Sequence, residues 1–211
     1  SSIATWQPIG GSYGQVSINR GNNVWGINSG QIWQYRSGNW FQIYQALAVS
    51  IGVGTDGTVW VKVDGALVQI SVGDKNHVWG VSRQNEIFYR TNGDINGTWV
   101  RVAGALKQVS VAADGTVWGV NNNGAIFRWN GALWELIPGN LTQIDVSCAS
   151  YIIGTSSSYD IYQYRRRSWF KYDDGSLAYV SISVDGIIWG VDANGHIYTR
   201  QDGGFDGPAF K

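Results

Sequence analysis

The sequence has little of what several common protein classes depend on. Its one cysteine, Cys148, can form neither an internal disulfide nor a cysteine-based zinc site. Methionine is absent, and the only glutamates are Glu86 and Glu135, so residues that favour helices are scarce. No apolar run approaches the ~20 residues that span a bilayer as a helix. We therefore predict a chain with little helix and no membrane insertion.

Charged residues are also few. They make up 14% of the chain, whereas an average soluble protein has about 25%. The 15 basic residues balance the 15 acidic ones, and a molecule without net charge has no long-range attraction for a polyanion. Because binding to phosphates requires clustered positive charge, nucleic acid is not a predicted partner.

Groups that could carry catalysis are isolated in the sequence. The two histidines, His77 and His196, are framed by no nucleophile motif, and neither glutamate is repeated or paired. A hydrolase needs two placed carboxylates, or a base with a second group that orients it. His, Asp and Glu are not clustered at the spacing of metal ligands either. The sequence predicts no enzyme, no metal site and no cofactor.

Aromatic residues and glycine are abundant, with 12 Trp, 11 Tyr and 29 Gly, and they form a repeat. The pattern recurs about every 35 residues, a period typical of solenoids, propellers and arrays. It reads Gly-x-Leu-x-Gln-Val-Ser-Val, then Trp-Gly-Val, then Ile-aromatic and a closing Trp, and its clearest copy covers residues 104–137. The Ser and the Trp are eight residues apart in four copies: Ser17/Trp25, Ser71/Trp79, Ser110/Trp118 and Ser181/Trp189. Asp145 and Ile153 hold these places in a fifth copy.

Each copy predicts four short antiparallel strands. Asp-Gly and Asn-Gly pairs lie between the strands and form tight turns because they accept positive φ. About six such units in one chain predict an all-β, six-bladed β-propeller in a single domain, residues 1–211. The expected repeats are 11–44, 45–64, 65–103, 104–138, 139–174 and 175–211.

Two features of the repeats are irregular. The second repeat, 45–64, lacks about one hairpin, so we expect a truncated blade there. The N-terminal segment 3–10 carries a closing tryptophan, Trp6, ahead of the first repeat, and we expect it to complete the last blade and close the ring. Phe205, seven residues after Tyr198, is the alternative fourth strand of that blade.

The repeat resembles that of the tectonins, on the motifs Leu-x-Gln-Val-Ser-Val, Asp-Gly-Thr-Val-Trp-Gly-Val-Asn and Ile-Phe-Arg-Trp-Asn-Gly followed by Trp. The resemblance covers about residues 6–200, and tectonin-like lectins occur in slime moulds, mushrooms, horseshoe crabs and fish eggs. It implies a non-catalytic six-bladed lectin, with a preference for O-methylated sugars in fungal members. In its shortage of cysteine the chain is similar to the fungal and slime-mould members. The short second copy and the Trp-free fifth copy depart from the pattern.

A sugar site needs an aromatic platform for the apolar face of the ring and a few polar groups in a shallow pocket. Each repeat offers an aromatic residue on its third strand, a second aromatic or Arg two positions later on the same face, and a polar group after its second strand. The Gly that follows each repeat Trp would leave room for a methyl group. The predicted carbohydrate-binding residues are Trp25, Trp33, Tyr35, Trp79, Phe88, Arg90, Trp118, Asn121, Phe127, Trp129, Tyr162, Tyr164, Trp189, Asp192, Tyr198 and Arg200.

Several of these residues also have a structural interpretation. Blades pack face to face, so the Trp of each Trp-Gly pair is equally expected to fill the core between two blades. The closing Trp residues are expected to pack on outer strands, and the Asp of each Asp-Gly pair is expected to form a turn.

Two functions remain open on the sequence. The first is a multivalent lectin in defence, which binds terminal sugars, methylated or not, on foreign or cell-surface glycans and gains avidity from repeated inter-blade pockets. The alternative is a protein-interaction scaffold, which predicts one asymmetric apolar patch instead of recurring pockets. The even spread of aromatic residues favours the lectin, and a homo-oligomer would raise its valency. Cysteine usage favours a cytoplasmic location, with secretion or the cell surface as the alternative.

Overall fold

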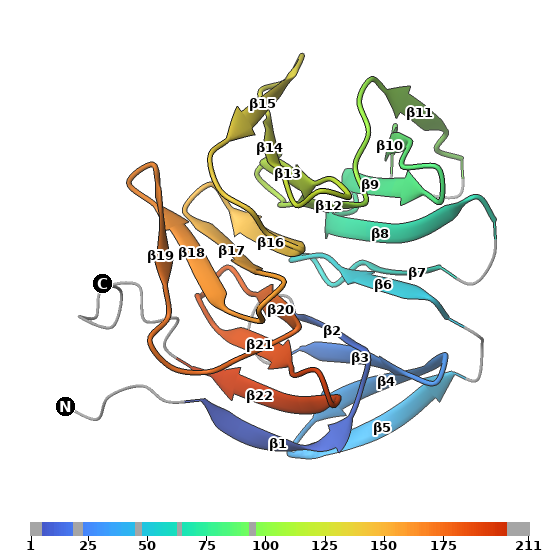
Figure 1. The fold of residues 1–211 in the computed structure, drawn as a ribbon. Helices are drawn as coiled ribbons and strands as arrows, with labels where there is room; N and C mark the ends of the chain where they lie inside the picture. Colours follow the sequence, from blue (N-terminus) through green and yellow to red (C-terminus); the bar gives the residue numbers. More distant parts are fainter. Residues whose placement is uncertain (1–5, 19–22, 45–47, 63–64, 93–95, 202–211) are drawn as a thin grey trace.

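The computed structural model describes residues 6–18, 23–44, 48–62, 65–92 and 96–201. The described segments consist of strands and turns, and none of them forms a helix long and apolar enough to cross a membrane. Six antiparallel sheets follow one another around a central axis (Figure 1). The prediction of an all-β propeller is confirmed.

Four of the sheets are blades of four consecutive strands each. The first blade contains β2 (Gln15–Ile18), β3 (Val24–Asn28), β4 (Gln31–Arg36) and β5 (Asn39–Tyr44). The second blade contains β8 (Leu67–Asp74), β9 (His77–Ser82), β10 (Ile87–Arg90) and β11 (Trp99–Val102). The third blade contains β12 (Gln108–Val111), β13 (Val117–Val120), β14 (Ile126–Trp129) and β15 (Trp134–Ile137). The fourth blade contains β16 (Gln143–Cys148), β17 (Tyr151–Thr155), β18 (Ile161–Arg165) and β19 (Ser168–Lys171).

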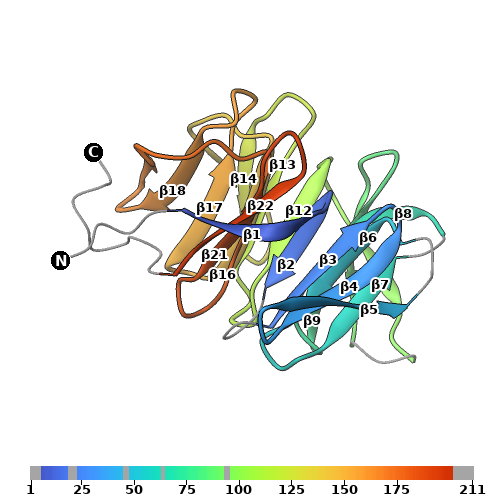
Figure 2. The same ribbon diagram turned by 90° about the horizontal axis from the view of Figure 1, so that it is seen from below.

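The fifth blade takes strands from both ends of the chain. It contains β20 (Tyr179–Ile182), β21 (Ile188–Val191), β22 (His196–Arg200) and, as its outermost strand, β1 (Gln7–Ser12). β1 pairs antiparallel with β22, with Pro8 opposite Tyr198 (Figure 2). Phe205, the alternative fourth strand, lies outside the described residues.

The sixth sheet has only two strands, β6 (Ser50–Val53) and β7 (Val59–Lys62), and we call it the half-blade. It lies between the first and second blades, where the second repeat was expected. The prediction of six blades is therefore wrong, and the structure has five. The reason is chain length, because the residues between β5 and β8 provide one hairpin and not two.

The Gln of the Gln-Val-Ser motif joins the inner strands of neighbouring blades at three boundaries. The Gln108 side chain donates to the carbonyl of Ile144 at 2.7 Å and accepts from the N–H of the same residue at 2.8 Å. The amide thus replaces a backbone pair between two strands that are not otherwise hydrogen-bonded as a sheet. Two further pairs repeat this geometry: Gln69 with Val109 and Gln143 with Val180.

The Ser of the motif forms a second link between the same strands. Ser110 Oγ accepts the N–H of Val146 at 2.9 Å, and Ser71 and Ser181 make the equivalent bond to the next inner strand. In the fourth blade Asp145 takes this role and accepts from Ile182. The motif recurs because these bonds hold neighbouring blades together. Its recurrence is therefore explained without a ligand.

In four of the five blades the closing Trp fastens the outer strand to the chain that precedes the blade's first strand. The indole N–H of Trp134 donates to the carbonyl of Ala103 at 3.0 Å, and the ring lies against Gly104. Gly104 has a φ of +121°, and a Cβ there would lie 3.0 Å from the indole, so only glycine fits. Three further bonds are equivalent: Trp6 to Asp174, Trp40 to Gly10 and Trp169 to Pro138.

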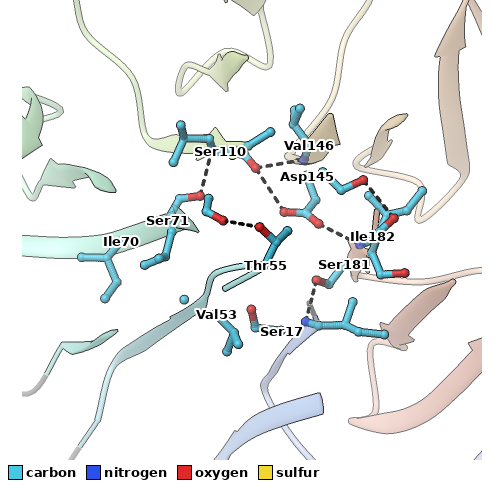
Figure 3. A pocket seen from close by; sticks show the side chains of 18 of the residues that line it. Ser17, Val53, Thr55, Ile70, Ser71, Ser110, Asp145, Val146, Ser181 and Ile182 are labelled. Atoms are coloured by element: carbon cyan, nitrogen blue, oxygen red, sulfur yellow. Dashed lines mark hydrogen bonds between the residues drawn. The ribbon is translucent and has the colours of Figure 1, made fainter. Parts of the chain in front are cut away.

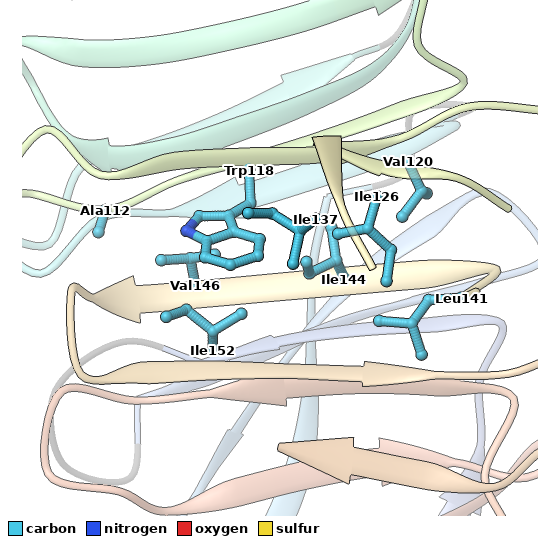
Figure 4. Close-up of a cluster of buried hydrophobic side chains, with 9 residues drawn as sticks. All are labelled: Ala112, Trp118, Val120, Ile126, Ile137, Leu141, Ile144, Val146 and Ile152. Atoms are coloured by element: carbon cyan, nitrogen blue, oxygen red, sulfur yellow. The ribbon is translucent and has the colours of Figure 1, made fainter. Parts of the chain in front are cut away.

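The core consists of separate clusters between neighbouring blades. Figure 4 shows the cluster between the third and fourth blades, in which Trp118 and Ile126 meet Leu141 and Ile144. Each blade therefore buries one face against the preceding blade and the other against the next, as expected for a propeller.

Candidate functional site

The predicted site residues gather at the boundaries between blades, but several are covered there. Trp118 of the third blade is 1% exposed. Tyr164 and Trp169 of the fourth blade cover it with ring centroids at 5.0 and 6.1 Å, and the Arg128 guanidinium lies 5.7 Å from its ring centroid. An aromatic residue of the third strand and a closing Trp thus enclose the tryptophan of the preceding blade.

The same arrangement recurs at two other boundaries. Tyr35 and Trp40 of the first blade enclose Trp189 of the fifth blade. Trp129 and Trp134 of the third blade enclose Trp79 of the second. Because Trp79, Trp118 and Trp189 are buried, we remove them from the predicted sugar-contacting set and assign them to the inter-blade core. Trp25 is the exception in this repeat position, since it is only half-buried.

The glycines beside these tryptophans do not form open pockets, as had been expected. Leu106, from the Gly-x-Leu start of the same repeat, occupies the space where a side chain of Gly119 would lie. Leu67, Leu141 and Leu177 fill the equivalent spaces at Gly80, Gly154 and Gly190, and Tyr13 does so at Gly26. A methyl group of a sugar therefore finds no cavity at these glycines.

The third-strand residues face the preceding blade and are half-buried. This set contains Trp33, Phe88, Phe127, Tyr162 and Tyr198, followed two positions later by Tyr35, Arg90, Trp129 and Tyr164. Arg200 holds the second position in the fifth blade but is buried, with an ion pair to Asp174 at 2.8 Å. Its guanidinium also lies 5.0 Å from the ring centroid of Tyr172. Arg200 is thus a buried structural cation and leaves the predicted sugar-contacting set.

Asn121 and Asp192 close turns between second and third strands. Asn121 Oδ1 accepts the N–H groups of Asn123 and Ala125, both at 3.0 Å. Asp192 Oδ1 accepts from Asn194 and His196 in the same way. Partial burial raises the pKa of the Asp192 carboxyl, but these N–H bonds outweigh it and hold the pKa below its usual range. Both side chains therefore have a structural role in these turns, and a sugar could contact them only in addition to it.

A cavity opens between the fifth and first blades on their outer side. The cavity measures about 370 Å³. The half-buried Tyr35 and the buried Trp189 line it. Ser37 and Gln201 also line the cavity. An aromatic surface and groups that form hydrogen bonds therefore converge in one place.

A second opening lies beside the half-blade. It measures about 330 Å³ and is lined mainly by apolar side chains, among them Trp60, Leu67, Phe88 and Trp99. Of these, only Phe88 was in the predicted site. The sequence pattern favoured outer-strand packing for Trp99 and did not decide whether Trp60 belongs to a closing or a second strand, although the short second repeat indicated that a hairpin was missing.

A small polar cavity of about 40 Å³ lies on the axis (Figure 3). Serine hydroxyls from several inner strands surround it, and Asp145 is the one carboxylate among its lining residues. Asp145 accepts from the hydroxyl of Ser110 at 3.1 Å and from the N–H of Ile182 at 2.7 Å. Removal from bulk water raises the pKa of Asp145 to about 6, although these hydrogen bonds oppose the rise. Within the described segments, no group of three or more His, Cys, Asp or Glu is placed to hold a metal ion.

Comparison with known families agrees with the repeat and the fold. The family model described as Tectonin domain matches residues 2–132 and 122–208, which together cover nearly the whole chain. The chain belongs to the Tectonin domain family. The resemblance inferred from the repeat motif is thereby confirmed.

A related protein of this family is Tectonin-1 of Physarum polycephalum. It is 36% identical over 85 residues, and the match covers 39% of this chain and 30% of Tectonin-1. The chain thus matches less than a third of the length of that relative.

Solved structures of several propellers share the fold at low sequence identity. The propeller domain of Cps50 (Swd1) from Myceliophteria thermophila has a TM-score of 0.58 at 8% identity, with 94% of this chain and 99% of that chain covered. YCF48 bound to D1 peptide has a TM-score of 0.54 at 14% identity, with coverages of 96% and 83%. At these identities the likeness concerns the fold alone.

Proposed function

We propose that this Tectonin-domain propeller is a non-catalytic sugar-binding protein and that its main site is the cavity between the fifth and first blades. The observation that carries this proposal is the meeting of Tyr35 with hydrogen-bonding groups in an open cavity of sugar size. A monosaccharide presents an apolar C–H face and a polar rim, and aromatic rings with nearby polar groups match both. Terminal sugars, O-methylated or not, are the ligand class.

Tyr35 would carry the stacking contact. Its ring is fixed by Trp189 and Trp40, each at a centroid distance of 5.1 Å, so little entropy is lost when a sugar binds. Ser37 and Gln201 would hydrogen-bond sugar hydroxyls at the rim of the cavity. The Gln201 amide already donates to Thr199 Oγ1 at 3.2 Å, which orients the side chain.

The other blades offer weaker versions of the same surface. Trp129 and Tyr164 hold the position of Tyr35 in the third and fourth blades and are also half-buried. Weak binding at several such positions would gain avidity on a dense glycan surface. We propose defence against cells that carry foreign glycans as the role, in the cytoplasm or at the cell surface, with a homo-oligomer as a way to raise the valency.

Replacing Tyr35 with alanine is expected to lower affinity for the bound sugar about tenfold or more, because the stacking platform is lost. Tyr35→Phe keeps the ring and should retain most of the affinity. The measurement is a glycan array with paired methylated and unmethylated terminal mannose, fucose and galactose, followed by calorimetric titration with the best sugar.

Leu136→Ala is the matched control, because Leu136 is 66% exposed on the outer strand of the third blade, away from the cavity. Its affinity should equal that of the wild type. If the folded wild-type protein binds no glycan on the array, the sugar-binding proposal is wrong and the scaffold function takes its place.

A further inference from the structure

The half-blade leaves one edge of β7 without a neighbouring strand among the described residues. The N–H of Gly54 bonds to the carbonyl of Thr58, and in an antiparallel pair such bonded positions recur at every second residue. Trp60 and Lys62 therefore direct their backbone groups toward β6. Val59 and Val61 direct theirs to the opposite edge, where the second strand of every blade pairs with a third strand.

The side chain that a third strand would supply is also missing. In the second, third and fourth blades, the Ile of the third strand packs in one cluster with the Leu that starts the next repeat, and both are at most 2% exposed. The pairs are Ile87 with Leu106, Ile126 with Leu141, and Ile161 with Leu177. Leu67 has no such Ile before it and is only half-buried, which creates the 330 Å³ opening.

The face of the first blade that looks toward the half-blade is covered only in part: Ile27 and Ile32 pack against Ile51 and Val53, but the outer part of this face is open. Trp25 is the Trp-Gly tryptophan of that blade, and no described aromatic ring or guanidinium encloses it as Tyr164 and Trp169 enclose Trp118. Phe41 of β5 is 41% exposed and Val49, just before β6, is 59% exposed. Apolar surface thus lies on both sides of the free edge of β7.

We propose that the free edge of β7 binds an extended segment of a partner polypeptide, which pairs antiparallel with Val59–Lys62 in the place of a third strand. Backbone hydrogen bonds to an edge strand supply affinity, and alternate side chains supply specificity. The site continues the interface that joins every other pair of neighbouring blades. It lies apart from the proposed sugar cavity and does not depend on it.

The complete blades define the chemistry of this segment. In β14, Ile126 and Arg128 face the next blade, while Phe127 and Trp129 face the preceding one. A segment on β7 would therefore place an aliphatic side chain in the opening over Leu67 and aromatic side chains toward Trp25. The preferred partner is a strand with four successive positions: Ile or Val, then an aromatic residue, then a cationic or polar residue, then a second aromatic residue.

The third-to-fourth-strand hairpin of the third blade provides a probe with this pattern. A fluorescently labelled synthetic peptide with the sequence of residues 122–138 is titrated with the full chain, and binding is followed by fluorescence anisotropy. We expect saturable binding at peptide concentrations below about 1 mM. The same peptide with Ile126→Ser should bind about tenfold more weakly or worse, because the opening then receives no aliphatic group.

Two changes test the backbone pairing itself. Val61→Pro removes an N–H that points to the free edge and leaves the bonds to β6 in place, a position at which a strand tolerates proline. Methylation of the peptide nitrogen at Phe127 removes the opposing N–H, because this residue pairs with Gly119, the counterpart of Val61. Each change should lower affinity about tenfold or more. The control is Leu133→Ala in the full chain, on the exposed turn between β14 and β15. This variant should bind the peptide as the wild-type chain does.

The outcomes separate the possible occupants. Loss of binding with Val61→Pro and with the N-methylated peptide supports strand addition, and the peptide change decides alone if Val61→Pro does not fold. Absence of peptide binding, or binding that neither change weakens, overturns the proposal. A wild-type dimer in sedimentation that Val61→Pro converts to monomer, without peptide binding, would assign the edge to a second copy of the chain. Glycan binding is unaffected in either case, so failure here is distinct from failure of the sugar-binding proposal.

Discussion

Replacing Trp118 with alanine is expected to lower the free energy of unfolding by about 3–5 kcal/mol, the cost of removing a large buried aromatic side chain. The side chain is 1% exposed and packs against two aromatic rings and one guanidinium of two blades. Its indole N–H has no hydrogen-bond partner within the described part of the chain, so the loss comes from packing. The cavity would lie between two sheets that other clusters hold in place, and it can collapse only partly.

Trp25→Ala is the matched comparison, because Trp25 has the same place in the repeat sequence. Trp25 is only half-buried, next to the half-blade, and it donates a hydrogen bond to the side chain of Asn23 at 3.0 Å. We expect a loss of about 1–2 kcal/mol, from one hydrogen bond and a smaller buried area. Both variants would be unfolded in urea with intrinsic fluorescence and circular dichroism as probes. Equal losses would contradict the assignment of Trp118 to the core and of Trp25 to an open face.

These two residues show what the sequence could and could not predict. The repeat predicted the propeller, because the spacing of strand and turn residues depends only on local geometry within one blade. The pairing of the N-terminal segment with the last blade follows from a closing Trp that stands before the first repeat. Identical motifs gave no means to distinguish Trp118 from Trp25. Their burial depends on the next blade along the ring, and the two-stranded half-blade covers Trp25 only in part.

The pockets at the Trp-Gly glycines were wrong for a similar reason. The absence of a side chain at Gly119 indicated space, but the Leu106 side chain of the same repeat fills it. The Gly and the Leu are 13 positions apart in sequence and meet only through the pairing of β12 with β13. Sequence reasoning that treated each motif alone could not see this contact.

Function in this molecule should therefore reside where the repeats differ. The Gln, Ser and closing Trp positions are occupied by ring assembly. The position of Tyr35, in contrast, contains Arg90, Trp129, Tyr164 and Arg200 in the other blades, and only Tyr35 lines the open cavity between the fifth and first blades. The half-blade is a second point of difference. Both proposed sites lie at departures from the repeat and not at its most regular features.

Asp145 is a third departure, and it makes stability depend on pH. The pKa of Asp145 is raised to about 6 by removal from bulk water, compared with about 3.9 in an unfolded chain. Because the folded pKa is the higher one, the folded state holds a proton that the unfolded state has lost between these values. The contribution of Asp145 to stability is fully present below about pH 4 and is lost as the pH rises through about 6. Tyr179, whose own pKa is raised by burial and by the nearby Asp145, and the hydroxyls of Ser110 and Ser181 are the neighbouring groups.

Asp145→Ser installs the residue that most other blades have at this position. The Ser110 hydroxyl already accepts the N–H of Val146 in the equivalent geometry, so a serine at position 145 can accept the N–H of Ile182. We expect the variant to be more stable than the wild type by about 2 kcal/mol at pH 7. A pKa shift of this size, at ~1.4 kcal/mol per pKa unit, would give a larger difference for a fully enclosed carboxyl. The advantage should vanish near pH 4.

The measurement is urea unfolding of both proteins between pH 4 and pH 8, with the difference taken at each pH so that all other titrating groups cancel. Asp114→Ser is the control of opposite sign. Partial burial raises the pKa of the Asp114 carboxyl, but the backbone N–H groups of Thr116 and Ala149 outweigh it and lower the pKa. Its stabilising effect is therefore present at neutral pH and is lost as the pH falls through its folded pKa. If the wild type gains no stability relative to Asp145→Ser on acidification, the prediction is wrong. Asp145 would then be ionised at the axis, and its hydrogen bonds would offset the cost of removing the carboxylate from water.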